Sequence, residues 1–321
     1  MIKVGIVGAG GMGTVHYSNY KYIEDCKVVA IVGTSSQDKS RAEQWGLPMY
    51  NDIKSMVENE EIDVIDICTP TFLHKEHVIQ SIEERKSTIV EKPIALNYDD
   101  AKEMFDYAEE KGVLLFVAQV LQFTKEVEIL RNVVESGEYG KALDGYFERL
   151  SACPKWAQGG WLFDKDKSGL IPFDLHIHDL DVIISIFGKP KNISYTSCGG
   201  RDKDYKEQYR INYEYDNLNV VGEAAWFNAD IPFTARYRVY FENGMIINDG
   251  SKVTAYKFGA EKKVFDTEDA IKVPTGINVP PTGWYLNELK HFINCIKENK
   301  KSEVVSKEQV LTVIKILESF K

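Results

Sequence analysis

A glycine-rich turn near the start of the chain constrains its fold more than any other feature. A β-type run at residues 3–7 leads directly into the string GAGGMG, which places glycines at positions 8, 10 and 13. In a strand–turn–helix setting, the first glycine permits a tight turn, the second lets a pyrophosphate approach the backbone, and the third lets the helix pack closely. The sequence therefore predicts a dinucleotide-binding turn, formed by Gly8, Ala9, Gly10, Gly11, Met12 and Gly13.

Strands and helices alternate over the first third of the chain. Nearly continuous apolar runs, typical of parallel strands covered on both faces, lie at 3–7, 28–32, 64–68, 88–90 and 113–117. The clearest helix follows Asn97, where apolar residues recur at i, i+3, i+4 and i+7 until Gly112 ends the pattern. This order predicts an α/β domain with a doubly wound parallel sheet, the Rossmann arrangement, over residues 1–120.

The second part of the chain has longer β-type runs joined by hairpin turns. These runs lie at 145–150, 193–198, 209–215, 219–227, 234–242 and 245–248. Helical patterns lie at 125–135, 172–187, 285–298 and 307–319. We therefore expect an α+β domain with a large, open, mostly antiparallel sheet over residues 121–321.

The composition narrows the class of partner. The 39 basic and 49 acidic residues give a net charge of −10, and no long Lys/Arg cluster is present. We therefore expect neither nucleic acid nor a membrane surface as a partner. The five cysteines are scattered without a CxxC pattern, which favours free thiols in the cytoplasm. No stretch reaches the roughly 20 apolar residues of a membrane span.

The second β-type run ends without an acidic residue. About 20 residues beyond the glycine turn, a dinucleotide fingerprint carries an Asp or Glu that binds the ribose 2′-hydroxyl. This chain reads VGTSS from position 32. A missing carboxylate removes the repulsion that excludes a 2′-phosphate, and Thr34, Ser35 and Ser36 can donate hydrogen bonds to one. The sequence therefore favours NADP, with NAD left open because no Arg lies in the turn.

Two further segments follow strands at the edge where an open α/β sheet binds its ligands. They are CTPTFLH at 68–74 and EKP at 91–93. Lys92 lies beside a proline-restricted turn, so we expect its ammonium group to stabilise negative charge that develops on a substrate oxygen. A solvated surface lysine is the alternative.

A third segment, DLHIHDLD from position 174, carries two histidines. In a helix, Asp174 and His178 share a face, so the carboxylate can orient the imidazole as a proton acceptor near neutral pH. His176 points elsewhere and is interpreted as structural. Joint metal binding by Asp174, His176 and His178, as in a hydrolase, is the alternative. It needs a strand-like spacing, and we expect no metal.

Together these segments resemble the Gfo/Idh/MocA oxidoreductases, which include glucose–fructose oxidoreductase and inositol 2-dehydrogenase. The resemblance rests on the glycine turn, TPT with His74, EKP at 91–93, DxxxH at 174–178 and YxxE at 285–288. It implies a substrate-binding and oligomerisation domain after the Rossmann domain, with a homodimer or homotetramer formed through its sheet. One departure is Leu170, because the family often carries a second glycine after Gly169.

The resemblance also implies roles for single residues. It implies NAD(P)-dependent oxidation of a secondary alcohol of a sugar, inositol or related polyol, with Lys92 and His178 at the reacting hydroxyl and Asp174 supporting His178. The peptide before Pro93 is expected to be cis. The residues expected near the cofactor beyond the glycine turn are Thr69, Pro70, Thr71, His74, Glu91 and Lys92.

Four further residues have two interpretations or none. Trp161 is expected to contact the substrate, with core packing as the alternative. The same two alternatives apply to Trp156 and Arg149, and Tyr285 is undecided. A protein that binds NADP and regulates a partner without catalysis is the second interpretation, and the metal-dependent hydrolase is the third.

Overall fold

The chain forms two compact units, and the computed structural model describes residues 1–157, 160–200, 203–274 and 280–320. Unit 1 comprises Met1–Phe123 and Asp269–Lys315, and unit 2 comprises Thr124–Glu268 and Ile316–Lys321. The first segment of unit 1 ends at Phe123, whereas the first domain was expected to end at residue 120. The expected second domain of residues 121–321 and unit 2 differ in extent, because Asp269–Lys315 belong to unit 1.

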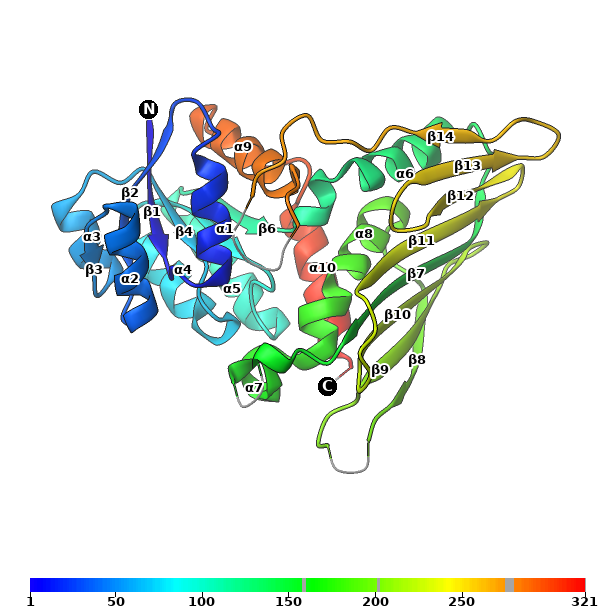
Figure 1. Ribbon diagram of the computed structural model, residues 1–321, viewed down its shortest axis with the longest axis horizontal. Coiled ribbons are helices and arrows are strands. Elements are labelled where there is room, and N and C mark those ends of the chain that lie inside the picture. The colour runs from blue at the N-terminus through cyan, green and yellow to red at the C-terminus, as the bar shows by residue number, and fades with distance from the viewer. Residues whose placement is uncertain (158–159, 201–202, 275–279, 321) are drawn as a thin grey trace. The chain divides into compact units, whose positions relative to one another are not determined.

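The described part of unit 1 contains a six-stranded parallel sheet in the order β3-β2-β1-β4-β5-β6 (Figure 1). The strands are β1 Ile2–Val7, β2 Cys26–Val32, β3 Met49–Tyr50, β4 Val64–Ile67, β5 Ser87–Glu91 and β6 Leu115–Ala118. β4 is buried at every residue, as expected of a strand covered on both faces. The strand order reverses between β1 and β4, and such switch points are where open α/β sheets bind their ligands.

Both chain segments of unit 1, Met1–Phe123 and Asp269–Lys315, contain helices. The helices are α1 Gly11–Tyr20, α2 Ser36–Trp45, α3 Ile53–Asn59, η1 Thr71–Leu73, α4 His74–Glu83, α5 Tyr98–Lys111, η2 Val120–Phe123, α9 Trp284–Lys297 and α10 Lys307–Glu318. The last three residues of α10 belong to unit 2. α9 lies beside α1 (Figure 1). Its buried Leu289 and Phe292 pack in one core cluster with Val4 and Ile6 of β1. This apolar packing is the physical reason that the late segment joins unit 1.

The described part of unit 2 contains an eight-stranded sheet in the order β14-β13-β12-β11-β7-β10-β9-β8 (Figure 1). The strands are β7 Ala142–Ala152, β8 Asn192–Cys198, β9 Gln208–Glu214, β10 Asn219–Phe227, β11 Thr234–Phe241, β12 Gly244–Asn248, β13 Val253–Lys257 and β14 Lys263–Phe265. β7 and β10 run parallel, and the other neighbouring pairs run antiparallel. This confirms the predicted fold class.

Two helical segments of unit 2 contain the sequence DLHIHDLD, which begins at position 174. They are α6 Lys125–Ser136, η3 Lys155–Ala157, η4 Trp161–Phe163, α7 Lys165–Ser168, η5 Pro172–His176 and α8 Ile177–Phe187. α8 packs on β7 and β10 and against α6. Within the described ranges of both units, no helix combines the length and the hydropathy that crossing a membrane requires.

Candidate functional site

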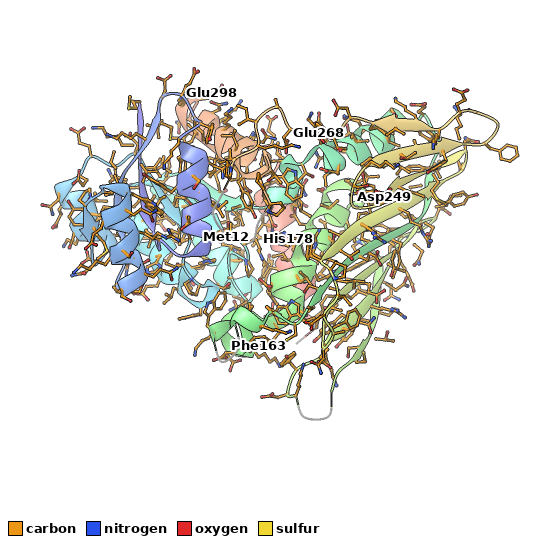
Figure 2. All side chains as sticks on the ribbon, in the orientation of Figure 1. Met12, Phe163, His178, Asp249, Glu268 and Glu298 are labelled. Atoms are coloured by element: carbon orange, nitrogen blue, oxygen red, sulfur yellow. The ribbon has the colours of Figure 1, made fainter. Side chains whose placement is uncertain are left out.

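The glycine turn connects the end of β1 to the start of α1, at the point where the strand order of the sheet reverses. Gly8 has φ +88°, a left-handed conformation that favours glycine. A Cβ on Gly13 would overlap the carbonyl oxygen of Gly8, so glycine is required for this close packing. A Cβ on Gly10 would meet no atom within 4 Å, which leaves the backbone open to a ligand. Figure 2 labels Met12 in the first turn of α1, whose N–H groups lack helical acceptors. The turn therefore fits a dinucleotide pyrophosphate.

The side chain of Asp38 lies against the end of β2. A Cβ on Gly33, at the end of β2, would lie 2.6 Å from Asp38 Cγ and 2.8 Å from its Oδ2. Oδ1 accepts from the Ala9 N–H at 2.8 Å. Oδ2 accepts from the N–H of Thr34 at 3.2 Å and from the N–H and hydroxyl of Ser35 at 3.0 and 2.6 Å. The expectation of a position without a carboxylate is therefore corrected. A capping box at the start of α2 folds the Asp38 side chain back onto it.

His74 joins the turns that follow β4 and β5. Its Nδ1 lies 2.8 Å from the carbonyl oxygen of Pro93, and its Nε2 lies 2.8 Å from that of Thr69. Burial lowers the pKa of His74 and outweighs the two carbonyl oxygens, which favour the charged ring. The Lys92–Pro93 peptide is cis, as predicted. A Cβ on Gly8 would lie 2.9 Å from Thr69 Cγ2. The ends of β1, β4 and β5 thus form one continuous edge, which we call the carboxyl edge.

A buried polar cluster, which the sequence analysis did not find, lies against this edge. His16 Nδ1 is 2.8 Å from Asp66 Oδ2, and His16 Nε2 is 3.1 Å from Glu91 Oε1. Tyr20 donates its hydroxyl to Asp66 Oδ2 at 2.9 Å. Glu91 Oε2 accepts from the backbone N–H of Lys92 at 3.0 Å. Both oxygens of Glu91, a residue expected to contact the cofactor, therefore contact groups of the chain itself.

The same cluster provides the one metal-like grouping among the described residues. Ligand atoms of His16, Asp66 and Cys68 all lie within 4.8 Å of one another. The contacts are direct, with His16 Nδ1 3.4 Å from Cys68 Sγ. Burial raises the pKa of Cys68 to about 12, so its thiol is protonated at neutral pH. This grouping differs from the Asp174, His176 and His178 set, so the metallohydrolase alternative gains no support.

Asp174 and His178 lie on two consecutive helical segments of unit 2. η5 winds as a π-helix, in which the N–H of Ile177 donates to the carbonyl of Pro172, and α8 follows it. Single π turns occur frequently at functional sites. Four residues stay within about one turn of such a helix, so Asp174 and His178 share a side. Both are half-buried, and Figure 2 labels His178 on α8.

His176 faces the sheet instead. Its Nε2 lies 2.6 Å from the Tyr213 hydroxyl, and the two rings stack with centroids 6.0 Å apart. A Cβ on Gly222 of β10 would lie 2.5 Å from His176 Cε1. Burial lowers the pKa of His176 to about 4, so the ring is neutral at pH 7. These contacts support a packing role for His176.

The turn before η5 explains the departure at Leu170. Gly169 has φ +70° and Leu170 has φ +60°. Two successive left-handed residues favour two glycines, and a leucine in that conformation is uncommon. Leu170 is held there because its side chain is buried and its N–H donates to Ser168 Oγ at 2.9 Å.

The structure places the aromatic and arginine residues that were considered for the substrate pocket in different environments. Arg149 forms a bidentate ion pair with Asp179, in which Nε donates to Oδ2 and Nη2 donates to Oδ1, each at 2.9 Å. Both residues are buried. Arg149 therefore ties α8 to β7 and has a core role. Trp161 is half-buried in η4, and Tyr285 belongs to unit 1. The side chain of Trp156 lies outside the described part of the structure.

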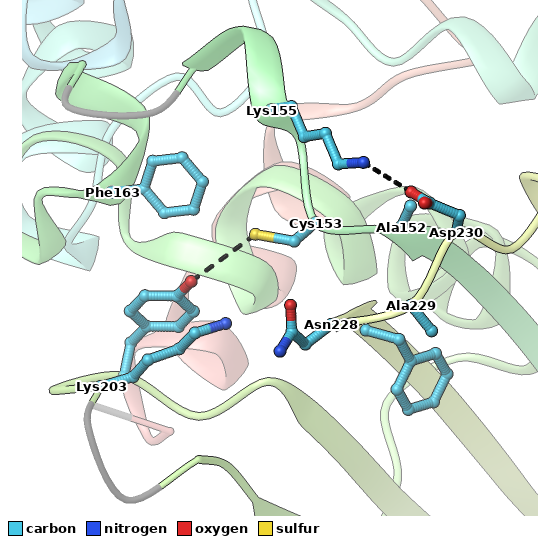
Figure 3. Close-up of a pocket in the computed structure, with 10 residues that line it drawn as sticks. Ala152, Cys153, Lys155, Phe163, Lys203, Asn228, Ala229 and Asp230 are labelled. Atoms are coloured by element: carbon cyan, nitrogen blue, oxygen red, sulfur yellow. Dashed lines mark hydrogen bonds and ion pairs between the residues drawn. The ribbon is translucent and has the colours of Figure 1, made fainter.

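A cavity of about 400 Å³ lies in unit 2 where β7 and β10 end (Figure 3). Its aromatic lining comes from Phe163, Tyr205 and Phe227, and its polar lining includes Lys203 and Asn228. The Phe163 ring packs edge-on against the buried Trp226, at 5.6 Å between centroids. The cavity thus has aromatic side chains, one of them packed against the core, and side chains that can form hydrogen bonds.

Two family models match most of this chain. Residues 2–119 match the model of an oxidoreductase family with an NAD-binding Rossmann fold, and residues 127–247 match the GFO/IDH/MocA C-terminal domain. The chain is 30% identical over 195 residues to D-glucoside 3-dehydrogenase of Escherichia coli (strain K12), covering 59% of this chain and 55% of the relative. It is 27% identical over 201 residues to 2,7-anhydro-N-acetylneuraminate hydratase of the same strain, covering 62% and 53%. The matches thus span little more than half of each relative's length.

A solved structure extends the similarity to the whole fold. Levoglucosan dehydrogenase in complex with NADH and levoglucosan has a TM-score of 0.85 to this chain. The similarity covers 99% of this chain and 95% of that one at 20% sequence identity. At this identity, the likeness concerns the fold.

Proposed function

Because this chain belongs to the Gfo/Idh/MocA oxidoreductase family, we propose that it is a nicotinamide-dependent dehydrogenase acting on a secondary alcohol of a sugar, inositol or related polyol. One observation carries the proposal. Glu91, Lys92 and Pro93 lie on the carboxyl edge, which His74 and Thr69 connect to the open glycine turn. A lysine is thereby held on the edge where a sheet of this kind binds its ligands.

The proposed chemistry assigns one task to each residue. When bound, the nicotinamide ring supplies the hydride acceptor. Lys92 donates a hydrogen bond to the reacting oxygen and stabilises the charge that develops on it. His178, oriented by Asp174, takes the hydroxyl proton.

The experiment is a screen of sugars, inositols and polyols with NAD⁺ and NADP⁺, read as absorbance of the reduced nicotinamide. Lys92→Met should lower turnover by about 10²–10³-fold, since a donor to the developing charge is lost, while NADH binding stays measurable by fluorescence. Lys102→Met is the matched control, because Lys102 is an exposed lysine on α5 that pairs with Asp106. Wild-type turnover in Lys92→Met would contradict the assignment.

Two other outcomes would identify different functions. Binding of a polyol without any nicotinamide reduction would favour the regulatory protein that binds dinucleotide without catalysis. Consumption of a substrate with no net change in nicotinamide absorbance would favour a hydratase, the activity named for one relative.

We propose NAD rather than NADP as the cofactor. Asp38 places a carboxylate at the end of β2, and Thr34 and Ser35 direct their donors to it. A 2′-phosphate carries about two negative charges and would be repelled there. The family model describes an NAD-binding Rossmann fold, which accords with this preference.

The cofactor proposal is tested by dissociation constants for NAD⁺ and NADP⁺. We expect wild type to bind NAD⁺ more tightly and Asp38→Asn to narrow the difference by about tenfold, the value of one removed charge repulsion of roughly 1.4 kcal/mol. Asp52→Asn is the control, because Asp52 caps α3 in the same unit. Equal binding of both nucleotides by wild type would contradict the proposal.

The cavity at the ends of β7 and β10 is proposed to bind a part of the substrate remote from the reacting hydroxyl. Faces of Phe163, Tyr205 and Phe227 offer apolar contact to sugar C–H groups, and Asn228 offers hydrogen bonds to hydroxyls. Trp161 stays a proposed substrate contact. Tyr205→Ala should raise KM and leave kcat nearly unchanged, since uniform binding is lost.

Homo-oligomer formation through the sheet of unit 2 is proposed as well. Tyr240, Met245 and Tyr256 lie opposite one another on β11, β12 and β13, and each tyrosine is 45% exposed. A row of exposed aromatic side chains on one sheet face is typical of an interface. Light scattering should show an oligomer that Tyr240→Glu dissociates, and a monomeric wild type would contradict this.

The five free cysteines accord with a cytoplasmic location.

A further inference from the structure

We propose that His16 is a positioning residue for Lys92: it holds the Glu91 carboxylate, and Glu91 holds the backbone at Lys92. The connection is short. His16 Nε2 lies 3.1 Å from Glu91 Oε1, and the Lys92 N–H donates to Glu91 Oε2 at 3.0 Å. The inference rests on the proposed function of Lys92 and concerns what keeps that residue in place.

Geometry indicates that the His16 ring is charged. Both ring nitrogens face carboxylates, because Nδ1 lies 2.8 Å from Asp66 Oδ2. A neutral imidazole has one N–H and one lone pair, so a lone pair would face a carboxylate oxygen unless both nitrogens carry protons. The contact to Glu91 has the distance of an ion pair without the alignment of a hydrogen bond. Charge attraction, little screened at a fully buried site, therefore holds Glu91.

The surroundings of His16 support this charge. Burial by itself lowers the pKa of His16, but the charge and hydrogen bond of Asp66, together with the contact to Cys68, more than offset burial, and the pKa lies well above its usual value. Burial raises the pKa of Cys68 to about 12 and also raises the pKa of Tyr20, so both groups are neutral at pH 7. The Tyr285 ring lies 6.2 Å away between centroids. Two carboxylates thus face one imidazolium.

Loss of the His16 charge would change the position of the Lys92 backbone, because Glu91 contacts both residues. A buried carboxylate without a cation is strongly disfavoured. Glu91 would then turn toward water and release the N–H of Lys92. A shift of about 1 Å in a group that positions the substrate can cost about 100-fold in rate.

Two substitutions separate the contacts of the ring. In His16→Asn the amide nitrogen lies where Nδ1 lies, so it keeps the bond to Asp66 and leaves Glu91 unsupported. In His16→Gln the amide nitrogen reaches farther, toward Glu91. We expect His16→Asn to lower kcat about 100-fold with the dissociation constant of NAD⁺ unchanged, and His16→Gln to recover most of the kcat.

Tyr20→Phe is the matched control within the same cluster. It removes the hydroxyl donated to Asp66 and leaves the pair of His16 with Glu91 intact. We expect a lower melting temperature and a wild-type kcat. A loss of kcat equal to that of His16→Asn would show that any damage to the cluster suffices, and it would overturn the proposal.

Hydrogen exchange at the Lys92 amide provides a readout that needs no substrate. Exchange should be faster in His16→Asn and unchanged in Tyr20→Phe. If His16→Asn does not fold, Glu91→Gln removes the same ion pair from the other side and should show the same loss of kcat. Wild-type kcat with wild-type exchange in the folded variant overturns the proposal. Wild-type turnover in Lys92→Met instead overturns the proposed function and leaves the exchange result standing.

Discussion

His16 in unit 1 and His176 in unit 2 are both completely buried, at 0% exposure, but their surroundings are opposite. Burial lowers the pKa of His16, but Asp66 and Cys68 together more than offset burial and raise the pKa well above its usual value. Against His176, burial outweighs the charge of Asp179 and lowers the pKa to about 4. The buried histidine of unit 1 thus faces carboxylates at the carboxyl edge, whereas that of unit 2 faces a tyrosine hydroxyl between a helix and a strand. The partner of a buried imidazole, more than its burial, decides which task it can perform.

The largest effect is expected when each histidine loses one partner. Asp66→Asn removes a buried counter-charge from His16 and should lower the free energy of unfolding by about 3–5 kcal/mol. Tyr213→Phe removes one neutral hydrogen bond from His176 and should cost about 1 kcal/mol. Urea unfolding at pH 7 measures both variants. Equal losses would contradict the difference in charge.

The second effect is a pH dependence of opposite sign in the two units. The pKa of His176 is about 4 in the folded chain and about 6.5 when unfolded. Between these values the unfolded chain binds the proton that the folded chain excludes, so stability falls as pH drops from about 6.5 to 4, by ~3 kcal/mol at most. His16, with its raised pKa, stabilises fully below about pH 6.5, and this stabilisation is lost as pH rises through the folded pKa.

Differences between wild type and two variants isolate these pH effects. The stability difference between wild type and His176→Gln should shrink as pH falls, whereas that between wild type and His16→Gln should shrink as pH rises. Unfolding free energies at intervals from pH 4.5 to 9 test this. Two differences with the same slope would break the comparison.

The smallest effect contrasts two glycines. Gly222→Ala places a Cβ 2.5 Å from His176 Cε1, and such overpacking should cost about 1–3 kcal/mol. Gly10→Ala meets no atom within 4 Å, so it should change stability by less than about 0.5 kcal/mol but weaken NAD⁺ binding. Melting curves and nucleotide titrations of both variants measure this. A destabilised Gly10→Ala with normal NAD⁺ binding would reverse the assigned roles.

The sequence predicted the elements whose signals are local. β4 is an apolar run because both faces are covered, and α5 begins at Asn97 and ends at Gly112 through ordinary caps. The strands β3 and β14 were missed because they have two and three residues, too few for a period to show. The strand β13 was missed as well, because burial along its five residues does not alternate. The π-turn of η5 was missed because its signal is a hydrogen-bond pattern and leaves no spacing in the sequence.

The contacts that support the site join residues far apart in the chain. His16 meets Asp66 across 50 positions, and Asp38 meets Ala9 across 29. Spacing rules do not reach such pairs, which is why the Asp38 carboxylate at the end of β2 was not predicted. One signal was available, since Asp66 stands inside the apolar run VIDI. A charged residue in a buried strand needs a partner, and His16 follows Gly13 by three positions.

The central proposal is that Lys92 and His178 serve the same step, one stabilising the substrate oxygen and the other removing its proton. A double-mutant cycle with Lys92→Met and His178→Asn tests it directly, by kcat/KM for the substrate found in the screen. Each single variant should lose about 10²–10⁴-fold. Because stabilising the oxygen and removing its proton serve one step, we expect the double variant to lose far less than the product of the single losses. Losses that multiply would show independent action and contradict the account.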